Sequence, residues 1–304
     1  MRIALIEIAK ILCGVIFAVL LLAVPGCVVR RVVHVHAPGQ AIPAREATLA
    51  ELVARIDAWS GPIRTMVATV DLAPTTGSVY SGVINKYTDV KGFILLQKPS
   101  NLRLLGQAPV VRTNIFDMVS TGDEFRLYIP SKRKFIIGKN TFRRPAKNSL
   151  ENLRPQHILE ALIVPPIDPE HETTYRRSTT SRTELKRYYV VNVVEPQSQK
   201  HIIPRRNIWF DRADLNLVRV QFYEPDGTCT EDVEYSAYHD FEGIHYPTHI
   251  EINRPEDDYE LTLTIDKATF NEPIAPEKFD LKRPEGVEVV NLSPAMPEGR
   301  SDGQ

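Results

Sequence analysis

The 304-residue sequence predicts a mainly β protein with two helices. Short apolar or alternating segments recur after about residue 64, and clusters of Gly, Pro, Asn and Asp separate them, which is typical of strands joined by turns. Connections such as residues 98–101 and 225–227 are too short for the crossover that a parallel pair needs, so antiparallel pairing is expected. Residues 93–96 are apolar on both faces of their strand, which indicates that both faces of the sheet are covered.

The first 26 residues have the three zones of a secretory signal peptide. Arg2 and Lys10 supply positive charge, an apolar run covers residues 11–24, and small residues follow. The run is short for a membrane span and fits an export signal. The alternatives are an uncleaved N-terminal anchor helix and an ordinary signal cut nearby. Residues 27–45 have no periodicity and are predicted to form a flexible tether.

Two helices are predicted, at residues 48–59 and 155–163. Thr48 and Glu51 have the spacing of a capping box, and apolar residues then recur at helical spacing. In the second segment Pro155 suits the first helical position, and a pair of prolines ends the helix.

Strands account for most of the remaining chain, and turn-forming residues set their limits. They are predicted at residues 64–72, 78–88, 91–98, 101–106, 110–119, 124–129, 134–139, 183–194, 205–211, 216–223, 228–239, 245–254 and 259–270. We prefer one sheet to two domains because no linker-like stretch divides these strands. A Pro-, Glu- and Gly-rich tail at residues 285–304 is predicted to be disordered.

The sequence offers no catalytic, metal or cofactor motif. A net charge of −1 gives no general electrostatic reason to bind nucleic acid. The segment that begins at residue 171 starts like a zinc-protease motif but has Tyr175 where the second histidine must coordinate. His239, His245 and His249 lack a recognisable ligand spacing. Neither an enzyme nor a metal site nor a cofactor is therefore predicted, and Cys229 is expected to be a packed strand residue.

The residues Val24-Pro25-Gly26-Cys27 resemble the lipobox of bacterial lipoproteins. This resemblance implies that the Cys27 thiolate takes a diacylglyceryl group before the signal is cut, and that the chain is then held to a membrane by acyl chains. Val28 follows the cysteine where inner-membrane retention favours Asp, so the outer membrane, on its periplasmic side, is the expected location.

The chain over residues 46–284 is similar to the LolA/LolB-like superfamily of bacterial outer-membrane lipoprotein-localisation proteins. The resemblance implies an unclosed antiparallel β half-barrel of about 11–12 strands with helices plugging its concave side. It is carried by diffuse motifs at residues 92–104, 117–125, 127–130, 154–162, 207–211, 246–250 and 270–274.

The same resemblance implies an apolar cavity that binds acyl chains of lipoproteins, or a related amphiphile, during transport to or insertion in the outer membrane. The expected wall residues are Val70, Phe93, Leu95, Leu104, Phe116, Leu127, Tyr189, Val191, Trp209, Val220, Phe222, Ile250 and Leu263. Pro109 and Val110 correspond to a protruding loop that would enter a membrane; alternatively, they begin a strand.

Two other functions remain open at this stage. One is an envelope sensor or assembly module that uses the same fold to bind a protein partner. A hydrolase is a more distant third, since absence of motifs does not exclude an enzyme.

Overall fold

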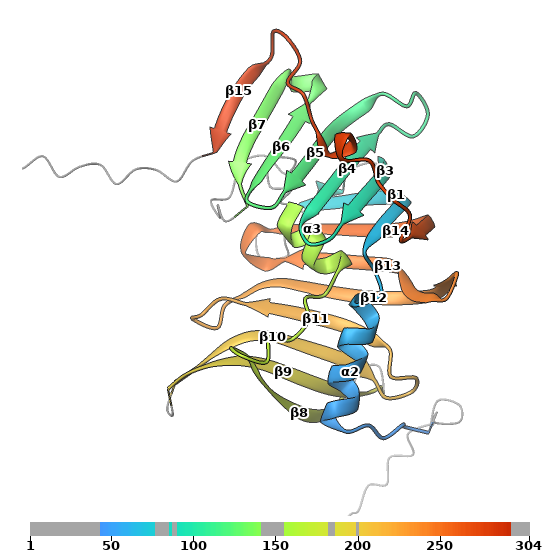
Figure 1. Cartoon of the computed structure of the whole chain (residues 1–304), viewed down its shortest axis with the longest axis vertical. Coiled ribbons are helices and arrows are strands. Elements are labelled where there is room, and N and C mark those ends of the chain that lie inside the picture. The colour runs from blue at the N-terminus through green and yellow to red at the C-terminus, as the bar shows by residue number, and fades with distance from the viewer. Residues whose placement is uncertain are drawn as a thin grey trace, which may run out of the picture. The chain divides into compact units, whose positions relative to one another are not determined.

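The computed structural model describes residues 43–76, 85–86, 90–140, 155–181, 186–198 and 201–292. The predicted signal peptide, Cys27 and most of the predicted tether lie outside these residues. The described residues form one 15-stranded sheet with the order β15-β7-β6-β5-β4-β3-β1-β14-β13-β12-β11-β10-β9-β8, and β2 pairs with β1 (Figure 1). The fold class expected from the sequence, a mainly β, unclosed antiparallel sheet with two α-helices, is confirmed.

The elements follow the chain in a simple order. They are α2 (Leu49–Ser60), β1 (Thr65–Thr76), β2 (Asn85–Lys86), β3 (Val90–Gln97), β4 (Asn101–Gln107), β5 (Asn114–Thr121), β6 (Glu124–Ile129), β7 (Lys134–Lys139), α3 (Pro155–Leu162), β8 (Thr173–Thr180), β9 (Arg187–Ser198), β10 (His201–Asp211), β11 (Leu217–Tyr223), β12 (Cys229–Phe241), β13 (Ile244–Arg254), β14 (Tyr259–Phe270) and β15 (Glu288–Leu292). Short 3-10 turns precede β7 and β14, and a third, η4, covers Pro276–Phe279.

Strand β1 lies in the middle of the sheet and joins two meanders. On one side β3 to β7 follow it in chain order, and on the other it pairs with β14, with Met66 opposite Phe270. Strands β7 and β8 therefore stand near opposite ends of the sheet, and the chain between them includes α3, which packs against β5 and β13. The described strands of both meanders thus belong to one sheet, as preferred from the sequence.

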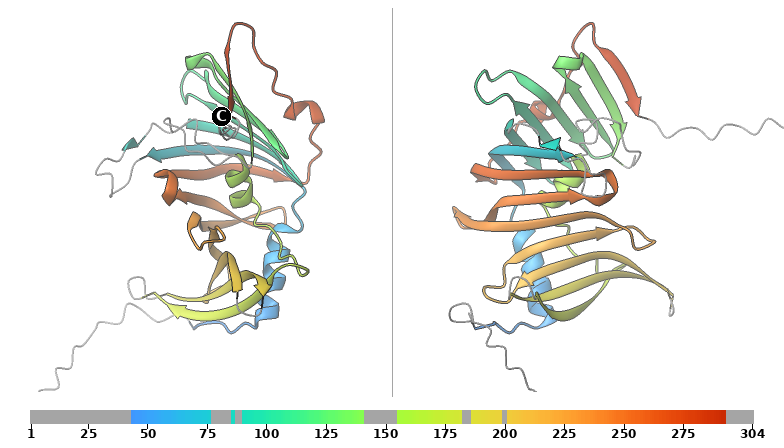
Figure 2. Two further views of the ribbon diagram at one scale, coloured as in Figure 1. Left: turned by 90° about the vertical axis from the view of Figure 1, so that its left-hand side faces the viewer. Right: turned by 180° about the vertical axis from the view of Figure 1, so that it is seen from behind.

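Helices α2 and α3 lie on the same side of the sheet (Figures 1 and 2). We call the sheet face that they cover the inner face. Helix α2 begins with the predicted capping box: the Thr48 hydroxyl accepts from the Glu51 amide, and the Glu51 carboxylate accepts from Thr48. Its buried Leu52 and Ile56 belong to the large apolar core of the inner face.

The opposite, outer face carries a smaller core under the chain that follows β14. Phe279 and Leu281 pack on Val119 and Phe135, which alternate with inner-face residues along β5 and β7. Arg103 holds this segment by donating to the Lys278 carbonyl at 2.7 Å. Around β5 and β7 the sheet is thus covered on both faces.

Four expectations need correction. Strand β8 was not predicted, because it is a polar strand at the end of the sheet. Strand β5 begins at Asn114 and not at residue 110, because a turn occupies the preceding residues. The tail predicted from residue 285 is not disordered at β15, which pairs in parallel with β7. The sheet has 15 strands and not about 11–12.

The predicted strand at residues 78–88 falls largely outside the described part of the chain, which shows only β2 there. Among the described residues, no helix combines the length and apolar character needed to cross a membrane.

Candidate functional site

The inner face is the candidate site, and alternate residues of the long strands build it. Successive side chains of a strand point to opposite faces, so one set of every second residue meets the helices. Ten of the predicted wall residues lie in or against this core: Val70, Leu104, Phe116, Leu127, Tyr189, Val191, Val220, Phe222, Ile250 and Leu263. Side chains of α2 and α3 pack in the same core.

Three predicted wall residues do not lie on the inner face. Phe93 is 39% exposed on the outer face, and Leu95 packs in the outer-face core. Trp209 lies between the buried Ile208 and Phe210 and points outward. The inward residues of these strands are their neighbours, because a shift of one position changes the face.

Tyr189 and two arginines hold the start of α2 against the sheet. The Tyr189 hydroxyl donates to Glu46 at 2.6 Å, and this hydrogen bond lowers the pKa of the Glu46 carboxyl. Arg212 pairs with the same carboxylate, and Arg176 donates to the Ala47 carbonyl. Both guanidinium groups also lie over the Tyr189 ring, at 4.5 and 4.7 Å from its centroid, as in cation–π contacts.

Aromatic contacts hold the other end of α2. Trp59 stacks on Tyr246 at 5.4 Å between ring centroids and meets Tyr235 edge-on at 5.6 Å. The Lys98 ammonium donates to the Ser60 carbonyl, which the helix itself leaves without a donor. Helix α2 is therefore fastened at both ends, while only a short apolar stripe lies between them.

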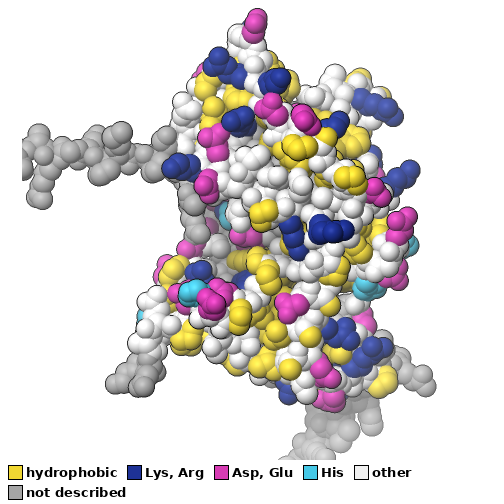
Figure 3. Space-filling view, viewed as in Figure 1, with side chains coloured by type: hydrophobic (Ala, Val, Ile, Leu, Met, Phe, Trp, Pro, Cys, Tyr) yellow, Lys and Arg dark blue, Asp and Glu magenta, His cyan; other side chains and the backbone are white. Residues whose placement is uncertain are grey.

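Two adjoining grooves open beside this end of α2. Their volumes are about 390 and 230 Å³, and both are lined by Pro62, Gly243 and Ile244. The smaller groove reaches the core residues Phe210 and Leu217. Apolar side chains come to the surface among charged ones on this side of the molecule (Figure 3). The smaller groove thus lies against the edge of the apolar core where α2 ends.

Helix α3 is held by two tyrosine hydroxyls. Tyr235 donates to the Ala161 carbonyl at 2.9 Å, and Tyr246 donates to the Leu162 carbonyl at 2.7 Å. These carbonyls lie in the last turn of α3, where intrahelical donors are lacking. Burial raises the pKa of both tyrosines, so both hydroxyls stay protonated and able to donate.

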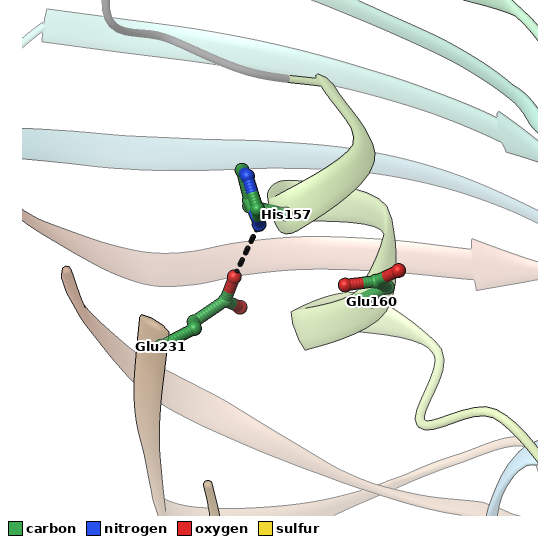
Figure 4. Close-up of side chains that lie close together, drawn as sticks. All are labelled: His157, Glu160 and Glu231. Atoms are coloured by element: carbon green, nitrogen blue, oxygen red, sulfur yellow. Dashed lines mark ion pairs between the residues drawn. The ribbon is translucent and has the colours of Figure 1, made fainter. Parts of the chain in front are cut away.

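A buried polar cluster lies between α3 and β12 (Figure 4). His157 Nδ1 is 2.7 Å from Glu231 Oε2, and Glu160 lies one helical turn from His157. Burial raises the pKa of the fully buried Glu231 carboxyl to about 8, and Arg254 opposes this shift. The cluster was not predicted, because no local spacing in the sequence joins α3 to a strand so far along the chain.

The outer face of β9 to β13 carries a broad polar groove of about 850 Å³. Trp209 lines it together with Tyr188 and Arg219. Trp209 meets the Tyr188 ring edge-on, and the Arg219 guanidinium lies 5.6 Å from its centroid. Trp209, expected in the apolar wall, therefore belongs to a different surface.

The predicted membrane loop is an exposed turn between β4 and β5. Val110 is 89% exposed and Val111 is 69% exposed, with Pro109 also exposed. The alternative, that Pro109 and Val110 begin a strand, does not hold, because β5 begins at Asn114. An apolar tip therefore projects from the turn.

These features define a class of protein: an unclosed antiparallel half-barrel with two helices over its apolar face. A family model described only as "-like: Uncharacterized protein" matches residues 167–283, and no curated protein matches the chain. A DUF1329 family protein from Desulfovibrio piger shares the fold, with a TM-score of 0.51 and 12% identity over 75% of this chain and 94% of that one.

Two further solved structures are similar over most of their length. A LolA superfamily protein from Nitrosomonas europaea has 13% identity over 78% of this chain and 99% of that one, with a TM-score of 0.47. A domain from Vibrio parahaemolyticus described as an outer membrane lipoprotein-sorting protein has 11% identity over 76% and 95%, with a TM-score of 0.48. What the chain shares with the DUF1329 family structure is a fold.

Proposed function

We propose that this chain is a lipid-anchored protein of the bacterial envelope that binds acyl chains of lipoproteins, or a related amphiphile, on the inner face of its sheet. It would act in lipoprotein transport or insertion at the outer membrane and would catalyse no covalent step. The observation that carries the proposal is the apolar inner face, which two short helices cover and which grooves reach at the end of α2.

The burial energies of helix α2 and of an acyl chain are compatible with one replacing the other on the inner face. Burial of Leu52 and Ile56 contributes about 3–6 kcal/mol to holding α2 on the sheet, in addition to the contacts at its two ends. A sixteen-carbon chain at about 0.8 kcal/mol per methylene offers roughly 13 kcal/mol before the costs of association. An acyl chain can therefore compete with the helix for the same apolar surface, and the helix can close over the face when the chain leaves.

The exposed turn supports a role at a membrane surface. Pro109, Val110 and Val111 place apolar side chains at a tip, where they could enter the interface of a bilayer. The lipid anchor on Cys27 and the outer-membrane location belong to this proposal, because the sequence pattern alone supports them. The similarity to a lipoprotein-sorting domain adds support at the level of the fold.

Photo-cross-linking with a diazirine analogue of palmitate tests the proposal on the full chain. We expect labels on peptides from the end of α2 and from β12 and β13. Ala58 is exposed on α2 and lines the smaller groove, so Ala58→Glu should reduce labelling several-fold without disturbing the core. Ala54→Glu is the matched control, because Ala54 is exposed on the same helix but does not line the grooves.

Equal loss of labelling in both variants would contradict the proposed entry site. Labels confined to the outer-face groove around Trp209, or no labels at all, would contradict acyl binding on the inner face. The protein-binding alternative would then be the better account of the fold.

A further inference from the structure

The polar cluster under α3 brings three metal-binding side chains together. His157 and Glu160 are three residues apart on α3, so both side chains lie on one face of the helix. Glu231 comes from β12, on the sheet that this part of the helix faces (Figure 4). One ligand atom from each residue can be chosen so that all three lie within 4.8 Å of one another.

Glu231 is an unusual residue to place here. Its side chain is fully buried, and neither carboxylate oxygen has a hydrogen-bond partner among the described residues. The nearest groups of opposite charge are His157 Nδ1, at 2.7 Å from Oε2, and Arg254 Nη1, at 3.7 Å from the same oxygen. Buried carboxylates are normally paired, hydrogen-bonded or bound to a metal ion.

The neighbouring arginines already have carboxylate partners. Arg254 donates to Asp257 at 2.6 Å through Nε. Arg206 donates to Glu172 at 2.6 Å and to two proline carbonyls in the segment that follows α3. Arg206 is thus balanced by Glu172, whereas Arg254 lies closer to Asp257 than to Glu231.

We propose that His157, Glu160 and Glu231 bind a divalent transition-metal ion of the zinc class. Such an ion would balance the two carboxylates and supply the coordination that Glu231 lacks. One imidazole and two carboxylates suit Zn²⁺ and similar ions, and three protein ligands leave a position for water. Ca²⁺ takes six to eight oxygen ligands and Mg²⁺ demands near-octahedral geometry, so this donor set fits them poorly.

The site would cross-link the two layers of the fold at one point. Helix α3 belongs to the connection between the two meanders, and β12 belongs to the second of them. Metal bound to both would fix α3 over the inner face. This inference does not depend on acyl binding.

Zinc titration of the full chain tests the inference. The purified protein is stripped with a chelator, and Zn²⁺ binding is followed by calorimetry and by the thermal unfolding midpoint. We expect one tight site per chain and a midpoint that rises with Zn²⁺. Loss of groups that only orient ligands weakens metal binding 10- to 100-fold, so His157→Gln and Glu231→Gln should each weaken it by at least about 100-fold.

The controls change the same residue types at exposed positions. His171 is 70% exposed and pairs with Asp168, and Glu234 is 59% exposed on the same strand as Glu231. His171→Gln and Glu234→Gln should bind Zn²⁺ like the parent chain. Glu231→Gln keeps the size of the side chain and removes a buried charge, so the variant should fold.

Three results would overturn the inference. The first is no Zn²⁺ binding by the parent chain. The second is equal affinity in the ligand variants and their controls, which would place the bound ion elsewhere. The third is binding of Ca²⁺ or Mg²⁺ in place of Zn²⁺, which would exclude the proposed class of ion.

Discussion

The hydroxyl of Tyr246 provides a direct test of how α3 is held over the inner face. It is fully buried and donates to the Leu162 carbonyl at 2.7 Å. Tyr246→Phe removes the hydroxyl and leaves the Leu162 carbonyl, in the last turn of α3, without this donor. A buried acceptor that loses its partner costs about 1–3 kcal/mol, so we expect the free energy of unfolding to fall by that amount.

Tyr246→Phe keeps the aromatic ring, so the stacking on Trp59 is preserved and the change reports on the hydrogen bond. Urea unfolding of the full chain, followed by tryptophan fluorescence and by circular dichroism, gives the free energy. For a domain of this size each kcal/mol lowers the thermal midpoint by about 2–4 °C.

Tyr175→Phe is the control, because Tyr175 is 49% exposed on the terminal strand β8 and should change stability by less than about 0.5 kcal/mol. An unchanged stability in Tyr246→Phe would refute the assignment of this hydroxyl as the anchor of α3.

Three other changes test separate parts of the structure. Phe279→Ala should lower the free energy of unfolding by about 3 kcal/mol in urea melts, because it empties the outer-face core, and a loss below about 1 kcal/mol would mean that this segment does not pack there. Val110→Asp combined with Val111→Asp should weaken vesicle flotation while stability changes by less than about 0.5 kcal/mol; undiminished flotation would exclude the turn from membrane contact. The hydrogen bond from the Tyr189 hydroxyl lowers the pKa of Glu46, so the ionised carboxylate stabilises the fold above its ordinary pKa, and this stabilisation is lost as the pH falls through the lowered pKa. The free energies of unfolding of the parent and of Glu46→Gln, measured against pH, should therefore converge in acid. A difference between them that does not change with pH would contradict this.

Local signals in the sequence were enough to predict most of the sheet. The limits of β14, Tyr259–Phe270, agree with the predicted segment, because turn residues bracket a long alternating run. The capping box at Thr48 also formed as expected. Such features depend on residues a few positions apart, which a single sequence displays directly.

The two missed strands depend on distant partners. The sequence of β8 is TTYRRSTT, which lacks an apolar alternation because the strand ends the sheet and is mostly exposed. Strand β15 pairs in parallel with β7, and no short turn in the sequence connects the two strands and indicates their pairing. Polar or terminal strands therefore leave little local signal, although the pairing is regular.

The site was predictable only in part. The apolar character of the strands indicated a covered face. Periodicity alone does not say whether the odd- or the even-numbered residues of a strand face inward, and Phe93 and Trp209 were predicted on the wrong face. No sequence pattern indicated a role for Glu231, because His157 and Glu160 lie on a helix in another part of the chain. Only the tertiary structure brings those groups together.

The pairing of β1 with β14 has a consequence for how the chain must be made. Contacts such as Met66 with Phe270 join the beginning of the folded region to its final third, which raises the average contact order and slows folding. Until β14 has been synthesised, the edge of β1 that will pair with it has free amides and carbonyls. An apolar strand with such an edge can associate with other chains. A truncation before β14 should therefore yield aggregates and not a smaller barrel.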